Sequence, residues 1–213
     1  MNGSIGTFAI VYGAILAQMI VFVACSWGLA AALGARVIDV MMGAPGLVRF
    51  RAGGVAVRIG LVPGASLGFA GRGNDCGDDP RGWRRLPLAR RLAIVVGPWL
   101  VSCAIAVALL GGRALTSIAH GFVQVLYPLD PTPLVRRFVE LAAHAPMTVV
   151  LGLVLAKLTA MNLLPLPSLA GGGVIDELRG GAPARGGWTM AGTLFVMLYI
   201  AGRFLYALVR VSI

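Results

Sequence analysis

Residues that bind metals or form disulfides are scarce in this sequence. Its 213 residues include two histidines, three cysteines and eight acidic side chains. Cys25, Cys76 and Cys103 have no CxxC spacing, and two of them lie inside apolar runs, which argues against a disulfide framework and a thiolate zinc site. Neither His120 nor His144 is followed at i+3 or i+4 by a histidine or carboxylate, so we expect neither to bind metal.

Charged residues are scarce as well. They make up 12% of the chain, against 58% hydrophobic residues, whereas soluble domains contain about 25% charged residues. The mean hydropathy is +0.88, and we predict an integral membrane protein in contact with membrane lipids. The net charge of +10 comes without a basic soluble domain interleaved with aromatics, so nucleic acid is not an expected partner.

Four apolar segments are long enough to cross a bilayer, for which about 20 residues are needed. They cover approximately residues 5–34, 92–110, 147–164 and 188–211. The first has no charged residue, and it is too long, and lacks the basic start, for a cleaved signal peptide. We therefore predict a mainly α-helical, single integral-membrane domain with four transmembrane helices and no PDZ-like or other soluble domain.

The distribution of arginine orients these segments. The loop over residues 36–91 holds ten of the 18 basic residues, and the positive-inside rule places such a loop in the cytoplasm. The N-terminus, the loop over residues 111–146 and the C-terminus then lie outside. In that outer loop an amphipathic run, Leu134 to Ala143, is flanked by prolines and predicts a helix on the membrane surface.

A β-hairpin is predicted in the cytoplasmic loop. Apolar and basic residues alternate on both sides of Gly53 and Gly54, a pattern typical of two strands joined by a two-residue turn. We expect a membrane-associated β-region over about residues 47–70, at the membrane surface. Its exposed edge offers hydrogen bonds to an added peptide strand, and we predict that this edge includes Val55, Val57 and Ile59.

The stretch "NLLPLPSLAGGG", residues 162–173, follows the third apolar segment. Pro165 and Pro167 prevent the helix from continuing, because proline has no N–H to donate. The glycines 171–173 permit a close approach of backbone to its surroundings. Irregular backbone at membrane depth requires protein or a water-filled cavity around it, so the stretch is either a plain interhelical turn or the wall of a site.

This stretch resembles the NxxPxPxLDGG motif of the site-2 protease family of intramembrane zinc metalloproteases. Six of the seven fixed positions match: Asn162, Pro165, Pro167, Leu169, Gly171 and Gly172. The seventh, an aspartate that the family uses as its third zinc ligand, is Ala170 here. The β-region and "RRLAIVVGPW" are similar to the family too, although Val101 stands where an asparagine is common. The resemblance covers nearly the whole chain.

The resemblance also implies an HExxH motif near the cytoplasmic end of the first transmembrane helix. Histidines at i and i+4 share a helix face and bind zinc there, and the glutamate activates a metal-bound water. Aligning HELGH with residues 31–35 places Ala31 and Ala35 at the histidines and Ala32 at the glutamate. Alanine cannot bind zinc, and Asp39 alone does not supply the three protein ligands of a catalytic site.

We therefore expect no bound zinc and no peptide hydrolysis by the family mechanism. Asp176 and Glu177, just past the glycines, are expected to be a solvated or capping pair. The same resemblance implies that the zinc-ligand positions face the cytoplasm of a bacterial inner membrane, and that substrates or partners are transmembrane segments.

Three functions remain open. The chain is a metalloprotease scaffold whose parent form cleaves transmembrane substrates, inactive either as a natural pseudoprotease or because its ligands were replaced deliberately. Alternatively, it is a non-catalytic membrane protein that binds transmembrane segments or a partner in the same groove. A small permease is the weakest hypothesis, since it depends only on Lys157 and Arg203 inside apolar segments, for which snorkelling is the commoner explanation.

Overall fold

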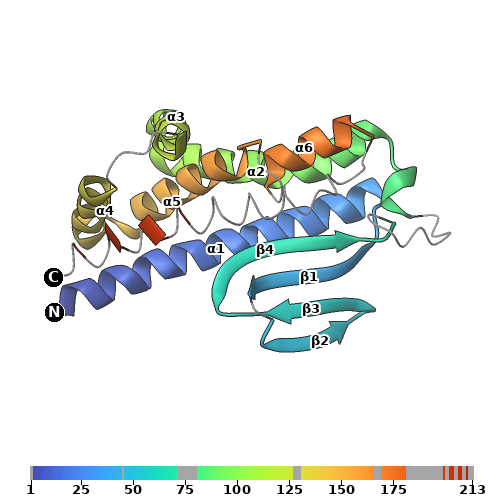
Figure 1. Ribbon diagram of the computed structural model, residues 1–213, viewed down its shortest axis with the longest axis horizontal. Coiled ribbons are helices and arrows are strands. Elements are labelled where there is room, and N and C mark those ends of the chain that lie inside the picture. The colour runs from blue at the N-terminus through green and yellow to red at the C-terminus, as the bar shows by residue number, and fades with distance from the viewer. Residues whose placement is uncertain are drawn as a thin grey trace.

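The computed structural model (Figure 1) describes most of the chain. The described residues are 2–44, 46–71, 81–126, 131–165 and 169–180, together with residues 199, 202, 203, 206, 207 and 210. Cys76, Pro167 and most of the fourth predicted transmembrane segment, 188–211, lie outside the described residues.

The described part is mainly α-helical with one small sheet, as predicted. A long helix precedes the sheet, and further helices follow it. In chain order the elements are α1 (Asn2–Leu33), β1 (Val37–Ala44), β2 (Val48–Ala52), β3 (Val55–Ile59), β4 (Val62–Phe69), the 3-10 helix η1 (Trp83–Arg85), α2 (Leu88–Leu110), α3 (Arg113–Leu126), α4 (Thr132–His144), α5 (Met147–Asn162) and α6 (Ala170–Leu178). The helix predicted over 134–143 is confirmed by α4, whereas α3 was not predicted.

Two of the described helices are long and apolar enough to cross a membrane, where we predicted four crossings. They are Ala9–Leu33 within α1, and α2, and the apolar windows that define them are 22% and 28% buried. The third predicted segment forms α5, which has 16 residues, fewer than the about 20 that a span requires. The structure therefore offers two candidate spans, on the basis of length and composition.

Helix α1 ends in a left-handed glycine. Gly34 has φ +83°, and its N–H donates to the carbonyl of Ala31 at 3.3 Å. The N–H of Ala35 donates to the carbonyl of Ala30 at 2.8 Å. Together these two bonds form a Schellman motif, which reverses the chain at a helix end. Strand β1 begins two residues later and runs back beside the helix (Figure 1).

The strands form one sheet in the order β2-β3-β1-β4. Antiparallel pairing of β2 with β3, around Gly53 (φ +56°) and Gly54 (φ +83°), confirms the predicted hairpin. Strand β1 is parallel to β3 and antiparallel to β4.

The prediction that Val55, Val57 and Ile59 form an exposed edge is wrong. These residues belong to β3, which is paired with β2 on one side and β1 on the other. The unpredicted strand β1 occupies the position that we expected to be free. The edges of the described sheet are therefore β2 and β4.

The sheet lies alongside α1 and not beyond its C-terminal end (Figure 1). At the turn between β3 and β4, the carbonyl of Leu61 accepts a hydrogen bond from the hydroxyl of Tyr12 at 2.8 Å. Tyr12 is about 30 Å from the end of α1, since a helix rises about 1.5 Å per residue. We predicted a sheet at the membrane surface, but this one extends beside most of the helix.

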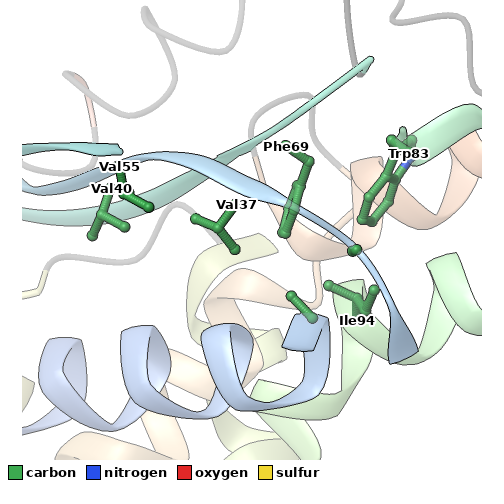
Figure 2. Packing of buried hydrophobic residues seen from close by; sticks show 8 residues of the cluster. Val37, Val40, Val55, Phe69, Trp83 and Ile94 are labelled. Carbon is green, nitrogen blue, oxygen red and sulfur yellow. The ribbon is translucent and has the colours of Figure 1, made fainter. Parts of the chain in front are cut away.

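A hydrophobic core holds the sheet against α1 and α2 (Figure 2). Its buried members are Ala30, Ala35, Val37, Val40, Val55, Phe69, Trp83 and Ile94. The rings of Phe69 and Trp83 stack with their centroids 4.5 Å apart, an arrangement that adds about 1 kcal/mol to the burial of the rings. The core thereby fixes the position of β4 relative to both helices.

The break predicted after the third apolar segment is confirmed. Helix α5 ends at Asn162 and α6 begins at Ala170. A Cβ atom on Gly171 would lie 2.3 Å from each of the carbonyl oxygens of Leu163 and Leu164. Glycine is therefore required there, because α6 packs directly on the backbone that follows α5.

Gly171→Ala is expected to lower the free energy of unfolding by about 2 kcal/mol, because the added methyl overpacks two backbone carbonyls. Gly28→Ala in α1 is the matched control, since a Cβ there meets nothing within 4 Å, and it should be neutral or stabilising by up to about 1 kcal/mol. Thermal unfolding of the purified protein measures both. Equal stability of the two variants would contradict the close approach.

Candidate functional site

A cavity of about 310 Å³ lies where α1, β4, α2 and the α5–α6 break meet. Each of these elements contributes part of its wall. The lining residues are Phe22, Ser26, Ala65, Ser66, Leu67, Phe69, Ile94, Val95, Trp99, Asn162, Leu169, Ala170, Gly173 and Asp176. The cavity is therefore built around the NxxPxPxLDGG-like stretch.

Two of the predicted wall residues, Asn162 and Leu169, line this cavity, and so does Ala170, which we predicted as a vacant ligand position. Gly171 and Gly172 lie in the first turn of α6, where Gly171 packs on α5. Pro165 is exposed. The stretch thus contributes Asn162, Leu169, Ala170 and Gly173 to the cavity lining, while Gly171 allows α6 to pack.

The part of α1 that faces the cavity is not the part we aligned with HExxH. Ala35 follows the Schellman motif, so it does not share a helix face with Ala31, and both Ala31 and Ala32 are exposed. Phe22 and Ser26 line the cavity instead, and their i, i+4 spacing is the one that two histidines need. The alignment was wrong because Gly34, taken as part of the motif, terminates the helix.

The side chains at the corrected positions do not fit zinc. Phe22 and Ala170 offer carbon atoms only, Ser26 offers a neutral hydroxyl, and Val23 stands where a glutamate would follow the first histidine. No group of three or more His, Cys, Asp and Glu residues able to hold a metal occurs among the described residues. The family's zinc therefore does not fit this cavity, and no hydrolytic step follows from it.

The carboxylate nearest to the aligned motif, Asp39, is engaged elsewhere. Its two oxygens accept hydrogen bonds from Arg58 Nε at 3.1 Å and Arg58 NH2 at 2.5 Å. This pair links β1 to β3 within the sheet. Asp39 is not among the described residues that line the cavity.

Asp176 and Glu177 are not the solvated or capping pair that we predicted. The Glu177 side chain is 1% exposed and accepts hydrogen bonds from Trp83 Nε1 at 2.8 Å and Arg91 NH1 at 2.7 Å. Neighbouring residues of a helix point about 100° apart, so Asp176 faces the cavity while Glu177 faces η1 and α2. Glu177 thus fixes α6, and with it one wall of the cavity.

The remaining polar groups of the cavity are few. Ser26 is 3% exposed, and its hydroxyl oxygen has no hydrogen-bond partner within the described part of the chain. Asn162 donates from Nδ2 to the carbonyl of Leu158 at 2.9 Å. The rings of Phe22 and Trp99 lie 4.9 Å apart at a tilt of 34°. The described lining therefore combines apolar and aromatic side chains with a few polar groups and one carboxylate.

The other residues considered from sequence lie outside the cavity. His120 and His144 are exposed. Lys157 donates from Nζ to Gln124 Oε1 at 2.8 Å, linking α5 to α3, and the guanidinium of Arg203 lies 5.5 Å from the ring centroid of Tyr199. Neither cation is part of the cavity lining.

Comparisons of the chain with protein-family models, with curated proteins and with solved structures found no match. The resemblance to site-2 proteases therefore stands on the residues themselves.

Removing the Glu177 carboxylate by Glu177→Leu should lower the free energy of unfolding by about 3 kcal/mol or more, because Arg91 is left buried without its partner. The control Glu140→Leu removes an exposed carboxylate from α4 and should change stability by less than about 0.5 kcal/mol. Chemical or thermal unfolding compares the two. Similar losses in both variants would show that the buried pair does not hold α6.

Proposed function

We propose that this chain is a non-catalytic membrane protein of site-2-protease-like architecture that holds an extended segment of a partner membrane protein. The observation that supports this most is the make-up of the cavity: an edge strand forms one wall, and the positions for metal ligands carry none. Such a site binds a peptide and has no means of cleaving it by zinc chemistry.

Strand β4 is the proposed docking strand. Among the described strands it pairs only with β1, and Pro63 near its start is typical of an edge strand, because proline cannot donate to a ladder. Ala65, Ser66 and Leu67 of β4 line the cavity. A peptide that adds to such an edge gains main-chain hydrogen bonds, while every second side chain is presented to the adjoining pocket.

Insertion in a lipid bilayer is part of the proposal. Large apolar side chains are exposed along both candidate spans, among them Leu16, Ile20, Leu100 and Val107. Contact of such side chains with lipid carries no hydrophobic cost, whereas their exposure to water is unfavourable. We retain α5 as a short third crossing and residues 188–211 as a fourth, in a bacterial inner membrane with the N-terminus outside.

Two other functions have less support. An active zinc protease would need metal ligands at Phe22, Ser26 and Ala170, and none of these side chains binds zinc as a histidine or carboxylate does. A permease would require its intramembrane cations to line a pathway, yet Lys157 is bound to Gln124 at the interface of α5 and α3. The binding hypothesis uses the same groove as the protease hypothesis and requires no missing side chain.

Zinc binding tests the architecture. The quadruple variant Phe22→His, Val23→Glu, Ser26→His and Ala170→Asp should bind about one zinc per chain, because three ligands then converge on the cavity. A second quadruple variant, Ala31→His, Ala32→Glu, Ala35→His and Ala170→Asp, should not bind zinc, since α1 ends before Ala35. Metal content after dialysis distinguishes them. If only the second variant bound zinc, the alignment of HExxH with residues 31–35 would be correct and the alignment with residues 22–26 would be wrong.

Photo-crosslinking tests the docking strand. A photoreactive residue at Ser66 in β4 should capture peptides from single-span membrane proteins, and the same residue at Arg49 in β2, the opposite edge of the sheet, is the matched control. We expect capture at position 66 to exceed capture at position 49 by about ten-fold or more, because only β4 borders the cavity. Equal capture at both edges would rule out β4 as the specific site.

A further inference from the structure

The cavity lining includes a charged side chain, Asp176, that the proposed binding of an extended segment does not explain. Asp176 is the only charged residue among the described residues of the lining, and it makes no ion pair or hydrogen bond with them or with the rest of the described chain. Its neighbour Glu177 takes the buried contact with Arg91. The carboxylate of Asp176 is therefore available to something that enters the cavity.

The rest of the lining is suited to a cation with an apolar stem. The rings of Phe22, Phe69 and Trp99 line the cavity, and aromatic faces attract ammonium groups, most strongly where water is excluded. Ser26, 3% exposed and with a hydroxyl oxygen that has no partner among the described residues, supplies a neutral hydrogen-bond acceptor. Since a buried hydroxyl without a partner is costly, Ser26 indicates that a polar ligand atom belongs beside it.

We propose that the cavity binds a primary ammonium group, and that the physiological ligand is a lysine side chain of the docked partner segment. The lysine ammonium carries three N–H donors, which suit the carboxylate of Asp176 and the hydroxyl of Ser26. Its four-carbon stem packs against Ile94, Val95 and Leu67. A quaternary ammonium has no donor for either group, and an anion is repelled by Asp176.

The choice of lysine rests on the proposed function, because it takes the ligand to be part of an extended segment on β4. A side chain of that segment at the level of Ser66 lies beside the cavity. The volume of about 310 Å³ exceeds the volume of one lysine side chain and is too small for a folded helix. In this arrangement the cavity binds one lysine side chain of the partner segment, while the edge of β4 binds the backbone of that segment.

The test uses n-butylammonium as a probe and n-butanol as its uncharged counterpart, with purified protein in lipid nanodiscs. Saturable thermal stabilisation by butylammonium, absent with butanol, is expected for the unaltered chain. Asp176→Asn should weaken butylammonium binding by about ten-fold or more, in keeping with loss of a charge-assisted hydrogen bond. Glu140→Gln, which removes an exposed carboxylate elsewhere, should leave the affinity unchanged.

Ser26→Ala is a second variant that keeps the proposal testable if Asp176→Asn fails to fold, and it should weaken butylammonium binding without creating binding of butanol. Affinity for butylammonium that is the same in Asp176→Asn and the unaltered chain, or equal stabilisation by butanol, overturns the proposal.

Peptide capture separates this inference from the proposed function. Two peptides that differ only by lysine or norleucine at one position are compared in crosslinking at Ser66. Preferential capture of the lysine peptide supports the inference. Equal capture of both overturns it and leaves the docking function intact, whereas butylammonium binding without capture of either peptide supports an ammonium site and overturns the docking function.

Discussion

The reversal of the chain at Gly34 is the constraint on which the rest of the structure depends. A left-handed residue at that point ends α1 and directs β1 back along the helix. Ala30 and Ala35, brought together by the Schellman hydrogen bonds, both enter the core between helix and sheet. Without this reversal the sheet would continue beyond the end of α1, and β4 would not reach the cavity.

The opposite wall of the cavity depends on a second constraint, which is the position in which α6 packs. The proline-interrupted stretch ends α5, and Gly171 lets α6 pack on the carbonyls of Leu163 and Leu164. The buried contacts of Glu177 with Trp83 and Arg91 then hold α6 against η1 and α2. Asp176, one residue earlier, is left on the cavity side. A structural ion pair and a candidate ligand-binding carboxylate thus occupy adjacent positions with different roles.

The described lining of the cavity contains no histidine, cysteine or glutamate. Its shape comes from apolar packing and from backbone geometry, neither of which requires a metal ion. Phe22 and Ser26 of α1 form part of the cavity lining, together with the rings of Phe69 and Trp99. Asp176 adds a carboxylate to this lining, and such a charge favours a cation over an anion.

Several features follow from the sequence alone, because they depend on local chemistry. The helical class, the hairpin at Gly53 and Gly54 and the break after Asn162 were all predicted correctly from hydropathy, glycine and proline. The absence of zinc ligands also follows from residue identities.

Only the tertiary structure decided which residues face one another. Strand β1 took the edge of β3 that we expected to be free, since strand pairing joins segments that no local pattern relates. The residues of α1 that line the cavity begin at Phe22. Our alignment had placed the first histidine position at Ala31, nine residues later in the chain. Local sequence determined where each element ends, and long-range packing determined which faces of those elements enclose the cavity.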